Sequence, residues 1–563
     1  MRKTFQKTIG KRGLALFMSA AMSVGLLTGC GSTEEEVPAY EYEAAMEEPA
    51  EEADYESVQE VAGAQWDTAA NGMQTDSAAA MEDCIQEPEY GYEPNEEEYE
   101  KAEENGFCLT AVQPLSTFSA DVDTASYANV RRMIEDGYTL DDINPDAVRA
   151  EEFINYFSYD LKLPKQGEKF GVTTEVGTCP WNEDHLLMMV GMRTQAIDMS
   201  EAPDNNLVFL LDVSGSMSDD DKLPLLQKSF KELVEELDEN DTVSIVTYAS
   251  GVETVLKGAG GNEKEKICNA IDELYAGGGT NGEGGIQRAY QLAETNFIEG
   301  GNNRVILATD GDLNIGISEP DELEKFIEKK RDSGIYLSVL GFGTGNIKDN
   351  NMERLADCGN GNYAYIDSLF EAKKVLVEEM GATLVTVAED VKLQVEFNPQ
   401  NVNAYRLIGY ENRMLEATDF NDDTKDAGEI GAGHTVVALY EIISVGSKDE
   451  ISLKYQGEKN DDKGYSSGYG DEFATVSIRY KEPGENESKL KSCVVDDGDF
   501  SNHPSDDYVF ASLAAEFSMI LSDSPNKGDA TLEGILKTYS TLDIDDEYKE
   551  EFYYLVKMMA KRQ

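Results

Sequence analysis

Five oxygen-bearing side chains of this sequence follow apolar runs or lie within a glycine-rich segment, and together they could bind a metal ion. They are Asp212, Ser214, Ser216, Thr280 and Asp310. The first three follow the apolar run 207–211, Asp310 follows the run 305–309, and Thr280 lies in the glycine-rich segment 277–282. Carboxylates and hydroxyls are ligands for hard cations such as Mg²⁺, and also for Mn²⁺ or Ca²⁺. Two carboxylates only balance the charge of such an ion, so we expect it to accept one more anionic oxygen from an Asp or Glu of a protein partner.

Four short apolar runs alternate with helical patterns and predict the sheet that positions these side chains. The runs are residues 207–211, 243–248, 305–309 and 336–342. Uninterrupted apolar strands that alternate with helices indicate an α/β fold with a doubly wound, mostly parallel sheet covered on both faces. In such sheets ligands bind at the carboxyl ends of the strands, where the five side chains are expected. Residues 252–256 are expected to add an antiparallel edge strand.

The remaining patterns predict an all-β sandwich-like domain followed by helices. Short strands are expected at residues 391–397, 405–409, 435–443, 451–455 and 474–480. The strands expected at 170–176 and 186–190 have no partner in a parallel sheet, so we expect them to join the sandwich, which makes the α/β unit an insertion within it. Helices are expected at 126–137, 147–157, 368–384, 506–521 and 545–561.

The amino terminus is typical of an exported bacterial lipoprotein. Basic residues precede the apolar stretch 13–27, which is too short for a comfortable membrane span and lacks a stop-transfer flank. It ends in LTGC at residues 27–30, which resembles the lipobox, in which the Cys is lipidated and becomes the new amino terminus. We therefore expect residues 1–29 to be a lipoprotein signal peptide. Cys30 would anchor the chain to the cell membrane or envelope on its extracytoplasmic side.

The charge of the chain is strongly negative, and much of it lies just after Cys30. Residues 30–105 are rich in Glu, and Lys101 is their only basic residue, so this segment is expected to be a disordered, self-repelling tether. The formal net charge of the whole chain is -64. This argues against nucleic acid as a partner, because phosphate binding needs clustered Lys and Arg. Contact with the membrane is expected through the lipid anchor only.

These patterns give the expected domain organisation. It comprises the signal peptide 1–29, the tether 30–105, an N-terminal α+β segment 106–200 that partly joins the sandwich, the α/β unit 201–385, the β-sandwich-like domain 386–485 and a C-terminal helical region 486–563.

Other oxygen-rich segments have structural interpretations. Residues 121–126 (DVDTAS) precede a helix and are expected to cap it rather than to bind a second metal. The run Asp219, Asp220 and Asp221 also precedes a helix, which it is expected to cap, although it could also shape the rim of the metal site.

Enzymatic activity is not expected. The chain has three histidines, and none lies within residues 201–385. Ser214 and Ser216 have no identifiable base, and the segment 277–282 lacks the Lys-Ser/Thr of a phosphate-binding loop. A metal-assisted hydrolase that uses a bound water is an alternative, but no general base is evident.

The five side chains also resemble a known site. Asp212-x-Ser214-x-Ser216, then Thr280, then Asp310 is similar to the metal-ion-dependent adhesion site of von Willebrand factor type A domains. Residues 118–127 (FSADVDTASY), 179–181 (CPW), 405–413 (YRLIGYENR) and 431–441 (GAGHTVVALYE) resemble the bacterial YfbK-like family. The resemblance implies an exported lipoprotein and says little about its role. We expect either metal-dependent binding of a protein partner or a structural or assembly role in the envelope.

Overall fold

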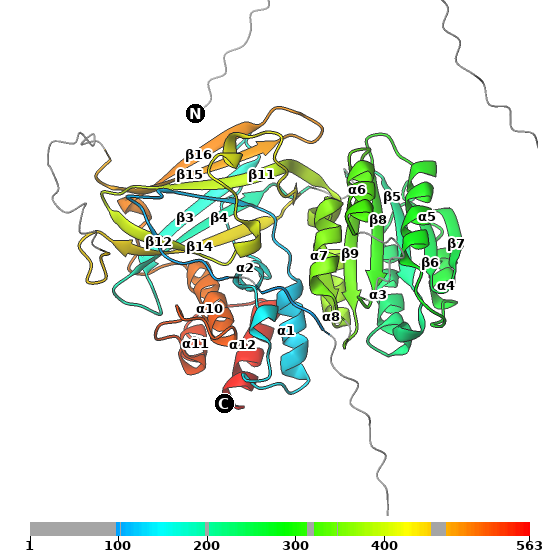
Figure 1. The fold of residues 1–563 in the computed structure, drawn as a ribbon, viewed down its shortest axis with the longest axis horizontal. Helices are drawn as coiled ribbons and strands as arrows, with labels where there is room; N and C mark the ends of the chain where they lie inside the picture. Colours follow the sequence, from blue (N-terminus) through cyan, green and yellow to red (C-terminus); the bar gives the residue numbers. More distant parts are fainter. Residues whose placement is uncertain are drawn as a thin grey trace, which may run out of the picture. The chain divides into compact units, whose positions relative to one another are not determined.

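The computed structural model of the protein describes residues 97–101, 103–197, 202–311, 320–345, 347–451 and 469–562 (Figure 1). All of them belong to one compact unit, residues 90–563. The expected signal peptide, Cys30, most of the expected tether and nearly all of the strand expected at 451–455 lie outside the described residues. None of the helices in the described part has the length and apolar character needed to cross a membrane.

A mostly parallel sheet forms the middle of the chain, as the sequence predicts. Its strand order is β10-β9-β8-β5-β6-β7, and every neighbouring pair is parallel except β6 and β7. The strands are β5 (Asn205–Asp212), β6 (Thr242–Tyr248), β7 (Val252–Gly260), β8 (Asn302–Thr309), β9 (Ile335–Phe342) and β10 (Tyr363–Ile366). The antiparallel edge strand β7 is therefore confirmed. The short strand β10 was not predicted, because four residues carry too little periodicity.

Helices cover both faces of this sheet. They are α3 (Leu223–Glu236), α4 (Lys264–Asp272), α5 (Gly282–Thr295), α6 (Pro320–Arg331) and α7 (Asp349–Cys358). Alternate residues of β5 serve the two faces: Leu207 and Phe209 pack in one core with α3 and α4, while Val208 and Leu210 pack in the other with α5 and α7. Because both faces are buried, residues 207–211 of this strand are all apolar rather than alternating with polar residues. The helix predicted at 368–384 is divided into α8 (Leu369–Lys373), a π-helix (Lys374–Glu378) and α9 (Met380–Leu384).

Two antiparallel sheets form the sandwich. One has the order β1-β12-β14-β4-β3, and the other has the order β13-β11-β15-β16 with β2 paired to β11. The strands are β1 (Cys108–Leu109), β2 (Leu115–Ser119), β3 (Phe170–Thr178), β4 (Leu186–Thr194), β11 (Thr386–Phe397), β12 (Val402–Ile408), β13 (Ile430–Gly431), β14 (Thr435–Ser444), β15 (Glu472–Lys481) and β16 (Lys489–Asp496). Because β4 pairs with β14, the α/β unit is an insertion within the sandwich, as predicted.

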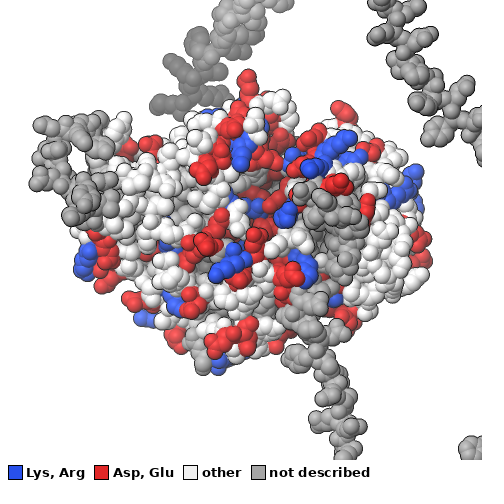
Figure 2. All heavy atoms as spheres, viewed as in Figure 1, with Lys and Arg blue, Asp and Glu red and all other residues white. Residues whose placement is uncertain are grey.

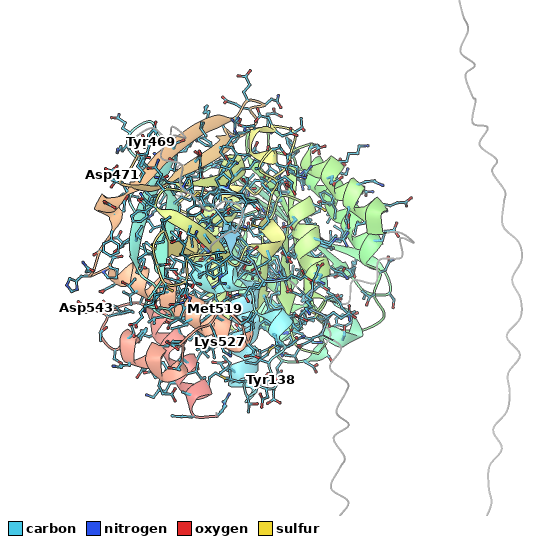
Figure 3. The ribbon with its side chains drawn as sticks, turned by 60° about the vertical axis from the view of Figure 1, so that its left-hand side comes forward. Tyr138, Tyr469, Asp471, Met519, Lys527 and Asp543 are labelled. Atoms are coloured by element: carbon cyan, nitrogen blue, oxygen red, sulfur yellow. The ribbon has the colours of Figure 1, made fainter. Side chains whose placement is uncertain are left out.

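Helices from both ends of the chain cover the outer face of the first sandwich sheet. They are α1 (Ala125–Glu135), α2 (Ala150–Asn155), α10 (Asp506–Leu521), α11 (Leu532–Tyr539) and α12 (Glu547–Ala560). On β4, Leu187 and Met189 pack with these helices, whereas Met188 and Val190 pack inside the sandwich. Met519, labelled in Figure 3, is buried near the C-terminal end of α10.

Buried arginines join the α/β unit to the rest of the folded chain. Arg131 of α1 donates to Asp367, with Nη2–Oδ1 at 2.6 Å, and to Glu371, with Nη2–Oε2 at 2.7 Å. Arg149 binds Asp349 and Glu353 of α7, with its nitrogens 3.1 and 2.6 Å from their carboxylate oxygens. In each pair the cation comes from outside the α/β unit and the carboxylates from inside it.

A third arginine corrects the interpretation of residues 121–126. The N-cap of α1 is Thr124, without a side-chain capping bond. Asp123 instead accepts a hydrogen bond from Arg413 (Nη2–Oδ2 2.8 Å), and Arg413 also lies 3.7 Å from Asp121. Burial raises the pKa of Asp121 to about 6, against the opposing effect of Arg413. These aspartates therefore belong to an ion-pair cluster rather than to a helix cap.

The end of the expected tether also packs on the folded unit, so its boundary at residue 105 lies too late in the chain. Arg132 Nη2 donates to Glu97 Oε1 at 3.1 Å, and Arg406 Nη1 donates to Glu104 Oε1 at 2.7 Å. Asn105 Nδ2 donates to the carbonyl of Gly409 at 2.8 Å. Carboxylates at the end of the acidic segment therefore pair with buried arginines of the folded unit.

The folded unit is acidic at its surface as well as in its sequence. Figure 2 shows Asp and Glu side chains scattered over the visible face, with Lys and Arg among them. Many charged side chains of the folded unit form pairs, such as Arg331 with Asp426 at 2.6 Å. A mixed but predominantly acidic surface favours solubility.

Candidate metal centre

Two adjacent strands deliver the two aspartates to one edge of the parallel sheet. β5 and β8 are hydrogen-bonded neighbours with Leu211 opposite Ala308, so the two strands end side by side. Asp212 is the last residue of β5, and Asp310 directly follows β8; both are fully buried. Thr309 Oγ1 donates to Asp212 Oδ2 at 3.2 Å and helps to fix the orientation of that carboxylate.

The turn after β5 brings two serine hydroxyls together. Asp212 Oδ1 accepts a hydrogen bond from the backbone N–H of Ser214 at 2.8 Å. A short 3₁₀ turn, η3 (Gly215–Ser218), follows, and the hydroxyls of Ser214 and Ser216 lie 3.0 Å apart. Ser214 is buried and Ser216 is exposed. The turn therefore presents one inner and one outer hydroxyl beside the carboxylate.

Backbone hydrogen bonds attach the glycine-rich loop to this turn. The N–H of Gly277 donates to Val213 O at 2.8 Å, and the N–H of Gly215 donates to Gly278 O at 3.0 Å. Gly278 has a φ of +90°, and a Cβ there would lie 2.7 Å from the hydroxyl of Ser250, so only glycine fits. Thr280, two residues further on, is half-buried beside Asn281, the N-cap of α5. The loop that carries Thr280 is thus held against the serine turn.

The electrostatics of this edge fit a cation. Burial raises the pKa of Asp212 to about 6; the hydrogen bonds from Ser214 oppose this shift, and the nearby Asp310 adds to it. Two buried carboxylates that repel one another are stabilised in their charged form by a positive ion. Within the described ranges, no cluster of three or more His, Cys, Asp or Glu side chains could hold a metal. The candidate centre instead has two carboxylates beside the hydroxyls of Ser214 and Ser216, with the loop that carries Thr280 held against them, and such oxygen donors suit a hard divalent cation.

A lysine that the sequence analysis did not select also lies in this centre. Lys222 Nζ is 3.0 Å from Asp310 Oδ2, and the side chain is 6% exposed. Lys222 is the N-cap of α3, where no side-chain capping bond forms. The expected capping of α3 by Asp219, Asp220 and Asp221 is therefore wrong. The sequence did contain an indication of this role: Lys is a poor N-cap, so a lysine directly before a helix is expected to serve another purpose.

The strand order, the flanking helices and the oxygen-rich edge define a von Willebrand factor type A domain. The family described as "von Willebrand factor type A domain" matches residues 206–379, and the family "von Willebrand factor" matches residues 93–189. The family "Uncharacterized protein YfbK, C-terminal" matches residues 382–561. The chain is 42% identical over 475 residues to "Uncharacterized protein YfbK" of Escherichia coli (strain K12), covering 83% of this chain and 81% of that protein. The chain belongs to the YfbK family.

Two further similarities cover smaller parts of the molecule. Inter-alpha-trypsin inhibitor heavy chain H3 of Homo sapiens is 26% identical over 159 residues, which cover 27% of this chain and 18% of that protein. A solved structure, the von Willebrand factor type A protein from Catenulispora acidiphila, aligns with a TM-score of 0.39 and 15% identity. It covers 71% of this chain and 91% of that one.

Proposed function

We propose that this protein binds a protein partner through a divalent metal ion held at the edge of its type A domain. The observation that carries the proposal is the convergence of Asp212, Ser214 and Ser216 with Asp310 and the Thr280 loop. Two observations support it: β5 and β8 end side by side next to Asp212 and Asp310, and backbone hydrogen bonds hold the loop that carries Thr280 against the serine turn. A type A domain in a chain of this family supports an interaction or scaffold role.

In this proposal the protein supplies the ligands and the partner completes the coordination. Asp212 and Asp310 would hold the ion, together with the hydroxyls of Ser214, Ser216 and Thr280. Mg²⁺ is the expected ion, with Mn²⁺ or Ca²⁺ as substitutes. Bound there, the ion would supply an electrophilic position for an anionic oxygen, for which an Asp or Glu carboxylate of the partner is suited. Ser216 and Thr280, which are not fully buried, lie on the side that a partner could approach.

We further propose that the protein is not an enzyme and that it acts outside the cytoplasm, anchored to the cell membrane or envelope through a lipidated Cys30. No histidine occurs between residues 186 and 433, a range that includes all five candidate ligands, so a general base for hydrolysis is not evident. A tethered binding domain suits either adhesion to an external partner or assembly within the envelope. The location of the partner separates these two roles.

The test is a pull-down of partners from envelope and extracellular fractions, with Mg²⁺ and with chelator. We expect the parent chain to retain a partner only with Mg²⁺, and Asp212→Ala and Asp310→Ala to lose it while remaining folded. Ser214→Ala and Thr280→Ala should weaken retention less, because each removes a neutral ligand that water can replace. Neutralising one Asp or Glu of the partner should be as damaging as removing the metal. A partner retained equally well in chelator would refute the mechanism.

A further inference from the structure

The lysine in the candidate metal centre is fixed from two sides. Its ammonium group pairs with Asp310, one of the two carboxylates expected to bind the ion. Its aliphatic stem lies against Gly343, where an added Cβ would come within 2.3 Å of Lys222 Cγ and 2.4 Å of Cε. Gly343 has a φ of +76°, which again favours glycine. The segment that follows β9 therefore provides a close-fitting support for a cation directed at Asp310.

That segment is in turn held by the end of the acidic N-terminal region. The N–H of Gly345 donates to Glu97 Oε1 at 3.1 Å, and the N–H of Glu98 donates to Ile347 O at 3.0 Å. Glu98 also pairs with Lys348, with Nζ–Oε1 at 2.6 Å. Glu97 is itself anchored to Arg132 of α1. We call residues 97–98 the strap, because they tie the segment after β9 to the rest of the folded unit.

We infer that Lys222 is an internal cation that competes with the metal ion for Asp310, and that the strap controls this competition. The inference rests on the proposed function and names the regulation of the same site. An ammonium group next to a carboxylate satisfies part of its charge, so an incoming divalent ion must displace that group or bind beside a like charge. Either event weakens metal binding.

The position of the strap indicates how this competition could be controlled. Residues 97–98 lie near the end of the segment that is expected to lead from the lipid anchor to the folded unit. While the strap is in place, the segment after β9 holds Lys222 against Asp310, and metal binding is weak. When the strap is released, for example by pulling on the N-terminal segment, Lys222 can withdraw and the metal binds more tightly. The anchored end of the chain would thus control the readiness of the site for a partner.

The test measures Mn²⁺ affinity by calorimetric titration of the full chain without any partner. Lys222→Met removes the charge and keeps an apolar stem beside Gly343, so we expect Mn²⁺ to bind about tenfold more tightly or better. The matched control is Lys231→Met, because Lys231 lies on the same helix but pairs with Asp272 on the surface. The control should bind Mn²⁺ like the parent. Thermal unfolding of each variant verifies that it is folded.

The strap is tested in the same titration by the double variant Glu97→Ala/Glu98→Ala. We expect Mn²⁺ affinity to rise about threefold or more in the parent background and to stay unchanged when Lys222→Met is already present. Glu103→Ala is the control, because Glu103 is exposed and lies in the same segment outside the strap.

The outcomes separate this inference from the proposed function. Binding by the Lys222→Met chain that is tighter than by the parent, or found only in the variant, supports the competition. Equal affinity in the two chains overturns the competition and leaves the metal site standing. No binding by either chain removes the metal site and the inference together. A strap variant that shifts affinity equally in both backgrounds would show that the strap does not act through Lys222.

Discussion

Replacing Arg131 tests most stringently how the type A domain is attached to the rest of the protein. Its guanidinium donates to Asp367, Glu371, Glu551 and the hydroxyl of Tyr156 at 2.6 to 3.0 Å. Arg131, Asp367 and Glu371 are all at most 4% exposed. Removing one member of a buried ion pair leaves uncompensated charge and costs about 3–5 kcal/mol. We therefore expect Arg131→Met to lower the free energy of unfolding by about that amount.

The assay is urea unfolding, monitored by circular dichroism and by tryptophan fluorescence, to which the buried Trp181 contributes. Adding Asp367→Asn and Glu371→Gln to the Arg131→Met chain should recover most of the loss, because the buried charges are then neutral. Arg288→Met is the control, since Arg288 is half-buried and donates only to Thr254 and Gln291 within the described residues; it should cost less than about 1 kcal/mol. An Arg131→Met chain as stable as the Arg288→Met chain would refute the reasoning.

Two further predictions concern pH and anchoring. Glu516 of α10 is 6% exposed, and burial raises its pKa from 4.5 to about 7. The folded chain therefore loses stability as the pH rises from 4.5 to about 7. In urea unfolding, the free energy of unfolding of Glu516→Gln should be higher than that of the parent by at most roughly 3 kcal/mol at pH 8, and the two should be equal at pH 4.5. A difference independent of pH would contradict this assignment. Cys30→Ser should release the chain from the membrane fraction or leave its precursor uncleaved. Processing and retention like the parent would exclude lipidation at Cys30.

Much of the fold was predictable because the burial of each strand is visible in its residues. β5 reads as a continuous apolar run because helices cover both faces of its sheet. β16 was not predicted because it is an edge strand on which even apolar residues, Leu490 and Val494, are exposed. Its residues therefore show no pattern typical of a buried strand. The helix predicted at 368–384 was divided by a π-helix, for which the sequence offered no breaker such as proline.

The candidate site was predictable where its residues follow strands and not where distant segments meet. Asp212 ends β5 and Asp310 directly follows the neighbouring strand β8, and the topology of a parallel sheet brings such strand ends together. Lys222 reaches Asp310 across 88 residues of chain, and Arg131 reaches Asp367 across 236. No local sequence pattern indicates an ion pair between residues so far apart in the chain. Likewise, residues 97–105 have the composition of a disordered tether, and only their contacts with buried arginines show where the folded unit begins.

Metal binding at the edge of the type A domain can be measured by calorimetric titration of the full chain and of its Asp310→Ala variant with Mg²⁺. Asp310 directly follows β8 and lies outside the apolar clusters, so the variant should keep its fold while losing one of the two charged ligands. It should be less stable than the parent, because Asp310 is a buried ion-pair partner of Lys222, and thermal unfolding verifies that it is folded. We expect one Mg²⁺ to bind per parent chain, and none, or one with far lower affinity, to bind to the Asp310→Ala chain. A parent chain that binds no divalent ion, or an Asp310→Ala chain that binds it with unchanged affinity, would exclude a metal site at Asp310.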